Sequence, residues 1–327
     1  MSWTLEALAE TGSESSFTTF GPFVPAVDDG GRVLFTAQTG SGRAVFVQGG
    51  DEVTPVIETG DHVTELVSHP VAAGDVYAVY AACGDHTALV IARGAGAPAE
   101  LVAEGAGPLG PTVNAHGDVA FRATDSQSVP SVFKRTAGGD LTLVARADGA
   151  PFRAFHGLPV IDDAGRVVFR ADHASGPGVF VCEGGRLREV GDASPFAALG
   201  FFPSANGAGR VVIAARTPTG ASLVLAASLA DTRRRWEVAH ATADALTGVR
   251  GALVDESGGL IVIETRADGG LAISSAERPI VAVGDDVLGS RVRDLALNPV
   301  SVRAAGIVAV RLVLEDGREI IARATRR

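Results

Sequence analysis

The sequence predicts an all-β protein, a seven-bladed β-propeller with four-stranded blades in a single domain over residues 1–327. Three observations predict it. A glycine followed by apolar residues recurs seven times, a second apolar pair follows each copy, and the two chain ends supply complementary parts of one blade. The copies are 43 to 49 residues apart, a spacing typical of propeller blades. The 41 glycines and 46% hydrophobic residues fit a large β core with frequent turns.

Seven glycines mark the repeat. They are Gly31, Gly74, Gly117, Gly165, Gly209, Gly258 and Gly306. The residues two to four positions after each glycine are apolar, as in Val33-Leu34-Phe35 and Val119-Ala120-Phe121. Such a continuous run indicates a strand covered on both faces, as a strand between neighbouring blades is.

An Asp or Asn stands three residues before the glycine in five copies. These residues are Asp28, Asn114, Asp162, Asn206 and Asp255. Their side chains can cap a type I turn, and glycine accepts the left-handed conformation that closes a hairpin. Copies two and seven have Val71 and Arg303 at this position, so their turns should differ.

Two more strands follow each hairpin. The third strand is apolar, as in Val45-Phe46 and Val179-Phe180, and a more polar fourth strand follows in six copies. The seventh copy reaches Arg327 without a fourth strand, and Trp3 to Gly12 has the form of the missing one. We therefore expect the N-terminal strand to complete the last blade and close the ring, which removes exposed sheet edges.

The third copy, Asn114 to Phe121, carries the pattern N-x-x-G-x-x-A-F. It resembles the repeat of bacterial tandem-repeat proteins that are described by this motif. The other copies keep the glycine and the apolar positions, so the resemblance spans nearly the whole chain. It implies a propeller of seven blades, and it offers no catalytic residues to carry over.

Charge and composition exclude several classes. The formal net charge of −10 would repel a phosphate backbone, so no nucleic-acid partner is expected. No apolar run is long enough to span a membrane, so no association with a membrane is expected either. The acidic first fourteen residues do not resemble a signal peptide, and the two cysteines fall in different repeats, so we expect a cytoplasmic protein with free thiols. A monomer is favoured.

Eight of the 14 phenylalanines lie outside the repeat positions. They are Phe17, Phe20, Phe23, Phe152, Phe155, Phe196, Phe201 and Phe202. All lie in or at the end of the loops that lead into blades one, four and five, which would face each other over the channel mouth. They predict a pocket for a hydrophobic small molecule. The alternative is that these rings plug the channel as ordinary core.

The same face collects five of the seven histidines, namely His62, His69, His86, His156 and His173. Imidazole is the natural proton carrier near neutral pH, although loop histidines are usually just solvated. His69 and His156 precede first strands of blades and are therefore the predicted catalytic pair, aided by Glu65 and Arg153. No metal-binding spacing occurs, so neither a metal nor another cofactor is expected.

Fold alone does not fix function. The leading interpretation is an enzyme that binds a hydrophobic small molecule at the channel mouth and acts by acid–base chemistry, as a lyase, isomerase or cyclase. The alternative is a non-catalytic scaffold that binds a protein partner through the same aromatic face. Sugar binding ranks third, because the chain has only two Trp and two Tyr residues for stacking.

Overall fold

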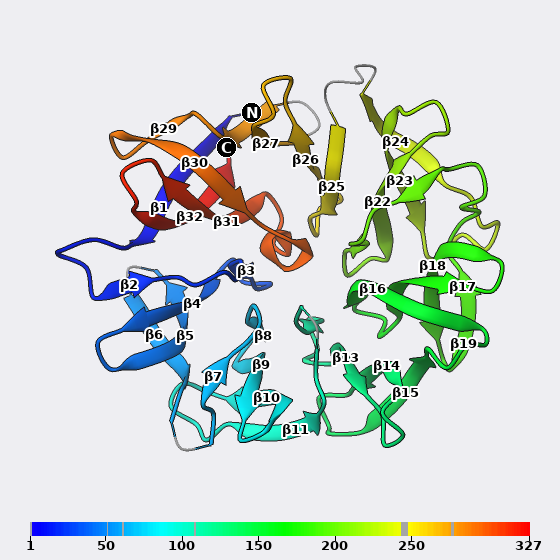
Figure 1. Cartoon of the computed structure of the whole chain (residues 1–327), viewed down its shortest axis with the longest axis horizontal. Coiled ribbons are helices and arrows are strands. Elements are labelled where there is room, and N and C mark those ends of the chain that lie inside the picture. The colour runs from blue at the N-terminus through cyan, green and yellow to red at the C-terminus, as the bar shows by residue number, and fades with distance from the viewer. Residues whose placement is uncertain (1, 51, 61, 108, 243–247, 276–277) are drawn as a thin grey trace. The chain divides into compact units, whose positions relative to one another are not determined.

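The chain is all-β in the computed structural model, which describes residues 2–50, 52–60, 62–107, 109–242, 248–275 and 278–327. The described strands form seven antiparallel sheets, one for each predicted blade (Figure 1). The 3-10 segment Pro299–Val302 is the one helical element among these residues. The described residues therefore contain no helix that is long and apolar enough to cross a membrane. The predicted seven-bladed propeller class is confirmed.

Two compact units divide the chain. The first contains Met1–Pro111 and Ile280–Arg327, and the second contains Thr112–Pro279. The single domain expected over residues 1–327 stays a prediction.

The first unit holds three sheets. The first sheet is β2 (Phe17–Thr19), β3 (Ala26–Val27), β4 (Val33–Thr39), β5 (Gly42–Gly49) and β6 (Glu52–Glu58). The second sheet is β7 (Glu65–Leu66), β8 (Val71–Ala73), β9 (Val76–Cys83), β10 (His86–Arg93) and β11 (Glu100–Glu104). The seventh sheet is β29 (Asp286–Val287), β30 (Ser290–Ala296), β31 (Ile307–Leu314), β32 (Glu319–Arg326) and β1 (Trp3–Glu10).

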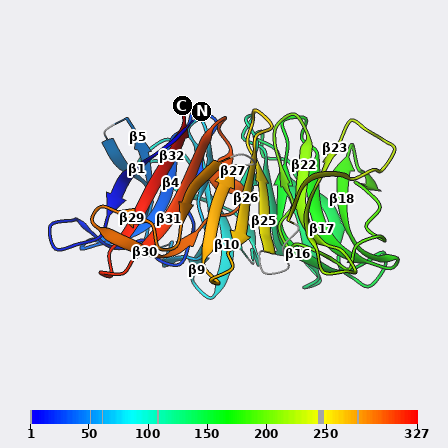
Figure 2. The same ribbon diagram turned by 90° about the horizontal axis from the view of Figure 1, so that it is seen from above.

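The N-terminal strand completes the seventh sheet, as predicted. Strand β1 pairs antiparallel with β32, from Trp3 opposite Arg326 to Glu10 opposite Ile320. Figures 1 and 2 show the two chain ends side by side at this sheet. The pairing covers an edge of β32 that would otherwise leave a row of backbone groups without partners.

The second unit holds the third, fourth and fifth sheets and the sixth sheet as far as Pro279, because the boundary between the units falls within β28. The third sheet is β12 (Thr112–Val113), β13 (Val119–Thr124), β14 (Pro130–Arg135) and β15 (Leu141–Arg146). The fourth sheet is β16 (Phe152–Ile161), β17 (Val167–His173), β18 (Gly176–Glu183) and β19 (Arg186–Glu189). The fifth sheet is β20 (Ala198–Leu199), β21 (Ser204–Ala205), β22 (Arg210–Arg216), β23 (Ser222–Ser228) and β24 (Glu237–Thr242). The sixth sheet is β25 (Gly248–Val254), β26 (Leu260–Thr265), β27 (Leu271–Ser275) and β28 (Arg278–Ala282).

The predicted Asx turns are present. Asp162 Oδ1 accepts a hydrogen bond from the Arg166 backbone N–H at 2.8 Å, and Gly165 has φ +74°. The Asn114 and Asn206 amides also donate to the next sheet, to the carbonyl oxygens of Asp162 and Asp255 at 3.0 and 3.2 Å. Each capped turn therefore closes its own hairpin, and the Asn turns also bind the following blade.

The two turns without an Asx residue differ, as predicted. In the second sheet, Ala73 pairs with Val76 across a two-residue turn. In the seventh sheet, the 3-10 segment Pro299–Val302 precedes the turn. The Asn298 side chain caps this segment by accepting a hydrogen bond from the Val300 backbone N–H at 3.0 Å.

The apolar core lies between neighbouring sheets. In the second unit, Ala120 and Val132 of the third sheet pack in one buried cluster with Phe169 and Phe180 of the fourth. A second cluster joins Val212 of the fifth sheet to Val262 of the sixth. This sandwiching explains why the strands after the repeat glycines are apolar on both faces.

Candidate functional site

The predicted phenylalanines occupy three kinds of environment. Phe20, Phe152 and Phe155 are buried, Phe17, Phe23, Phe196 and Phe202 are partly buried, and Phe201 is 62% exposed. The first three in the chain belong to the first unit and the other five to the second. That the two groups face each other over a channel stays a prediction.

Four of the eight predicted phenylalanines pack against the core, two in the first sheet and two in the fourth. Phe17 and Phe20 pack with the repeat residues Phe35 and Phe46 of the first sheet, with ring centroids 5.1 to 5.8 Å apart. We call Phe17, Phe20, Phe35 and Phe46 the first quartet. For Phe17 and Phe20, the core alternative describes the structure better than the pocket.

The fourth sheet repeats this arrangement. Phe152 and Phe155 pack with Phe169 and Phe180, with centroids 5.0 to 6.0 Å apart, and we call these rings the fourth quartet. Phe155 is part of the core, contrary to the expectation that it forms an accessible wall. Edge-to-face contacts of this kind stabilise aromatic clusters beyond their buried area.

A cleft of about 1020 Å³ lies beside the fourth quartet. We call it the aromatic cleft; its apolar lining includes Phe152, Phe180, Leu187 and Phe196, and its polar lining includes His173, Ser175, Arg188, Glu189, Asp192 and Arg234. Two predicted substrate-binding residues, Phe152 and Phe196, therefore do line a cleft together.

His173 is a titratable side chain in contact with the aromatic wall. Its ring lies 5.6 Å from the Phe152 ring and 5.3 Å from the Phe180 ring, measured between centroids. Its Nδ1 accepts a hydrogen bond from the Ser175 backbone N–H at 3.1 Å. Because a backbone N–H can only donate, the neutral ring carries its proton on Nε2. The site thus holds an oriented imidazole against an apolar wall.

Charged groups also line the cleft. Arg234 forms an ion pair with Glu189, and Arg188 donates to the carbonyl oxygen of Leu229, the residue after β23. Hydrogen bonds from the Ser194 backbone and side chain lower the pKa of Asp192, which keeps this carboxylate ionised. The cleft therefore offers both charges beside its aromatic wall.

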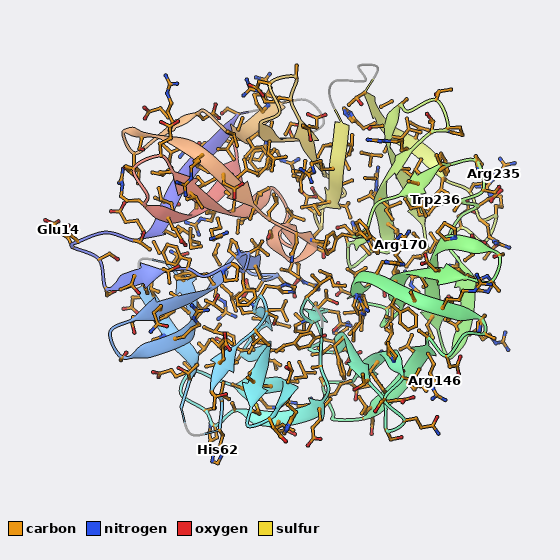
Figure 3. All side chains as sticks on the ribbon, viewed as in Figure 1. Glu14, His62, Arg146, Arg170, Arg235 and Trp236 are labelled. Carbon is orange, nitrogen blue, oxygen red and sulfur yellow. The ribbon has the colours of Figure 1, made fainter. Side chains whose placement is uncertain are left out.

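Trp236 directly precedes β24 of the fifth sheet, and Figure 3 labels its side chain there. A Cβ atom on Gly191 would lie 2.5 Å from the Trp236 Nε1, so the indole packs directly on the Gly191 backbone. The following residue, Asp192, lines the cleft. Trp236 is thus a natural reporter for the site.

His69, one of the predicted catalytic residues, has a structural position in the first unit. It is 3% exposed; its Nε2 lies 3.0 Å from the Pro111 carbonyl oxygen, and its Nδ1 accepts from the Asn298 amide at 3.2 Å. Burial lowers the pKa of His69 to about 4, although the Pro111 hydrogen bond opposes this shift. Since both nitrogens are bonded and the ring is neutral near pH 7, the geometry does not suit proton transfer to a ligand.

The other predicted catalytic residues are divided between the two units. Glu65 is exposed on β7 of the first unit, whereas Arg153 is exposed on β16 of the second. His156, also on β16, has its Nε2 2.9 Å from Asp172 Oδ2. The structure therefore gives His156 a carboxylate partner that the sequence did not predict.

Sequence reasoning grouped His173 with the histidines of the predicted channel face but did not select it as a candidate. It also missed Phe180, Glu189 and Arg234, which line the cleft from the third and fourth strands and from the loop before β24. The described residues contain no group of three His, Cys, Asp or Glu side chains arranged to hold a metal ion.

Comparison with known proteins supports the fold alone. No protein-family profile matches the sequence, and no curated protein matches it. The resemblance to the N-x-x-G-x-x-A-F repeat proteins therefore stays a prediction.

Solved structures do match. A prolyl endopeptidase, from a structural and mechanistic study of two such enzymes, aligns with a TM-score of 0.61 and 14% identity over 92% of this chain and 49% of that one. Prolyl oligopeptidase B from Galerina marginata aligns with a TM-score of 0.59 and 9% identity over 88% of this chain and 46% of that one. The chain spans about half the length of these structures, and the likeness shows a common propeller fold.

Proposed function

We propose that this propeller binds a hydrophobic small molecule in the aromatic cleft of its second unit. The observation that carries the proposal is the contact of His173 with Phe152 and Phe180 in the wall of a cleft of about 1020 Å³. Ligand sites are mostly apolar with a few placed polar groups, and their volumes reach about 1,000 Å³. The cleft has this volume and an aromatic wall, and its lining is more polar than that of most such sites.

The charged lining residues describe the ligand further. Arg188, Arg234, Glu189 and Asp192 can orient polar substituents, while Phe196 and Leu187 contact an apolar body. Leu187 is 42% exposed, so its side chain is available to a ligand. An amphipathic molecule with an apolar core fits this distribution.

Acid–base turnover is a second candidate function. His173 is the group that favours it, because its Nδ1 is fixed by Ser175 and its Nε2 is left to exchange a proton with a ligand. A lyase, isomerase or cyclase reaction would use such a group. The predicted pair of His69 and His156 is replaced by this single histidine in the proposal.

The protein-scaffold alternative has less support. It relied on an exposed patch of eight aromatic residues, and Phe201 is the one of these eight that is largely exposed.

A neutral dye, N-phenyl-1-naphthylamine, tests binding by its fluorescence gain in apolar sites. Phe196→Ala should weaken its binding by about tenfold, which corresponds to roughly 1.4 kcal/mol of lost apolar contact. Leu143→Ala is the matched control, because Leu143 is 47% exposed on β15 of the same unit and does not line the cleft. Equal affinities in the two variants would refute the site.

Turnover has its own test. Given a substrate from a metabolite screen, His173→Asn should bind it with similar affinity but convert it about 100- to 10,000-fold more slowly, as loss of a general acid or base does. Wild-type rates in this variant would leave binding as the function and remove the catalytic candidate.

A further inference from the structure

A second cluster of polar side chains lies on the other face of β17. Successive side chains of a strand point to opposite faces, so Arg170 and Asp172 project away from His173. The Arg170 Cζ lies 5.8 Å from the centroid of the Phe201 ring, which belongs to the bend between β20 and β21 of the fifth sheet. The His156 ring lies 5.9 Å from the same ring.

Arg170 is buried with little compensation. Arg170 is 8% exposed, and its Nη1 lies 3.4 Å from Asp172 Oδ1, near the distance limit of a hydrogen bond. Among the described residues, Arg170 Nε has no hydrogen-bond partner. Burial lowers the pKa of this guanidinium, and Asp172 only partly offsets the effect. A buried charge with unmade hydrogen bonds is costly, so an additional anion would stabilise it.

The exposed ring beside it is held in position by the backbone. Gly157 has φ +62°, and a Cβ atom there would lie 2.0 Å from the Phe201 carbonyl oxygen. Glycine is therefore required for the bend carrying Phe201 to approach β16 this closely. Arg122 adds a second cation, since its Nη1 donates to the Gly157 carbonyl oxygen at 3.0 Å.

We propose that Arg170 and Phe201 form a binding site for a planar monocarboxylate, whose carboxylate bonds the guanidinium while its flat body stacks on the Phe201 ring. Arg presents paired N–H groups that match a carboxylate. The nearby Asp172 favours a singly charged ligand over a more highly charged one, because it repels anions. Phe201 is 62% exposed, so a ligand can reach its ring.

The probes are 4-fluorobenzoate and its neutral amide, 4-fluorobenzamide, titrated by fluorine NMR against the whole chain. The benzoate should bind at least tenfold more tightly than the amide. Arg170→Gln should abolish this preference, whereas Arg153→Gln, which removes an exposed arginine of β16, should retain it. Phe201→Ala should weaken the benzoate threefold or more.

A further variant keeps the test decisive if Arg170→Gln fails to fold. Asp172→Asn removes the competing carboxylate, whose side chain is 41% exposed, and should strengthen benzoate binding severalfold. Equal binding of the two probes, an equal effect of Arg153→Gln and Arg170→Gln, or unchanged or weaker benzoate binding in Asp172→Asn would overturn the site.

Discussion

The first and fourth sheets contain the same aromatic quartet in the same place in the blade, yet their surroundings differ. In each, two phenylalanines from the first strand region pack on the repeat pair, Phe35 with Phe46 or Phe169 with Phe180. Phe17 lies opposite Thr39 in the first sheet, whereas Phe152 lies opposite His173 in the fourth.

The neighbouring clefts differ as well. The cleft beside Phe17 has a volume of about 830 Å³ and is lined by the end of β1 (residues 7–10), the linker of residues 11–16, Phe17, Leu288 and Arg318. The aromatic cleft has three phenylalanines and His173 in its lining. The quartet itself is therefore a structural feature. Both clefts have charged lining residues, so the phenylalanines and His173 distinguish the cleft of the fourth sheet.

The largest effect should come from the shared part. Phe20→Ala and Phe155→Ala should each lower the free energy of unfolding by about 3–5 kcal/mol, because both rings are buried in their quartets. Urea denaturation measures this, with the exposed Phe201→Ala as a control expected to stay within about 0.5 kcal/mol of wild type. A cost below about 1 kcal/mol for Phe155→Ala would mean that its ring is a pocket wall.

A smaller effect concerns the buried histidine of the first unit. Because the pKa of His69 is lowered to about 4 in the fold, the unfolded chain binds more protons between that value and about 6.5. The contribution of His69 to stability is therefore full above pH 6.5 and is lost as pH falls toward 4. It should amount to about 2 kcal/mol between pH 7.5 and pH 5.

Denaturation of wild type and His69→Gln at both pH values isolates this contribution. The variant should lose about 2 kcal/mol less than wild type on acidification. Identical pH dependence of the two proteins would show that His69 is accessible and protonates freely.

The smallest effect on stability should come from the residue that distinguishes the sheets. His173→Thr installs the side chain of the first sheet and should cost about 1 kcal/mol through lost contacts with Phe152 and Phe180. Dye binding should weaken in the same variant, and Thr39→His should not create a dye site in the first sheet. Thermal denaturation and the dye titration measure both; tight dye binding by His173→Thr would remove the histidine from the site.

The repeat made the fold predictable, because its period, glycines and Asx residues each have a local physical meaning. The hairpin at Asp162 and Gly165 follows from turn chemistry alone. A polar fourth strand could be read after the third strand in six copies. The place of the N-terminal strand followed from its absence in the seventh copy. Tertiary context was not needed for any of these elements.

The site was less predictable, because it depends on irregular register. Extending the pairing of Val160 with Val168 along β16 would place Phe155 opposite His173. Two register shifts in β16, around Gly157 and between Phe152 and Ala154, instead bring Phe152 opposite His173. Such irregularities have no reliable signal in one sequence, so the histidine nearest the aromatic wall was not selected.

Energy transfer from Trp236 tests the central claim most directly, since this residue packs on Gly191 beside the aromatic cleft. In a Trp3→Phe variant, which leaves Trp236 as the one tryptophan, its emission should fall as N-phenyl-1-naphthylamine binds, with the same midpoint as the dye signal. Phe196→Ala should move both midpoints about tenfold to higher dye concentration. Dye binding without any change in Trp236 emission would contradict the assignment of the ligand site to the fourth sheet.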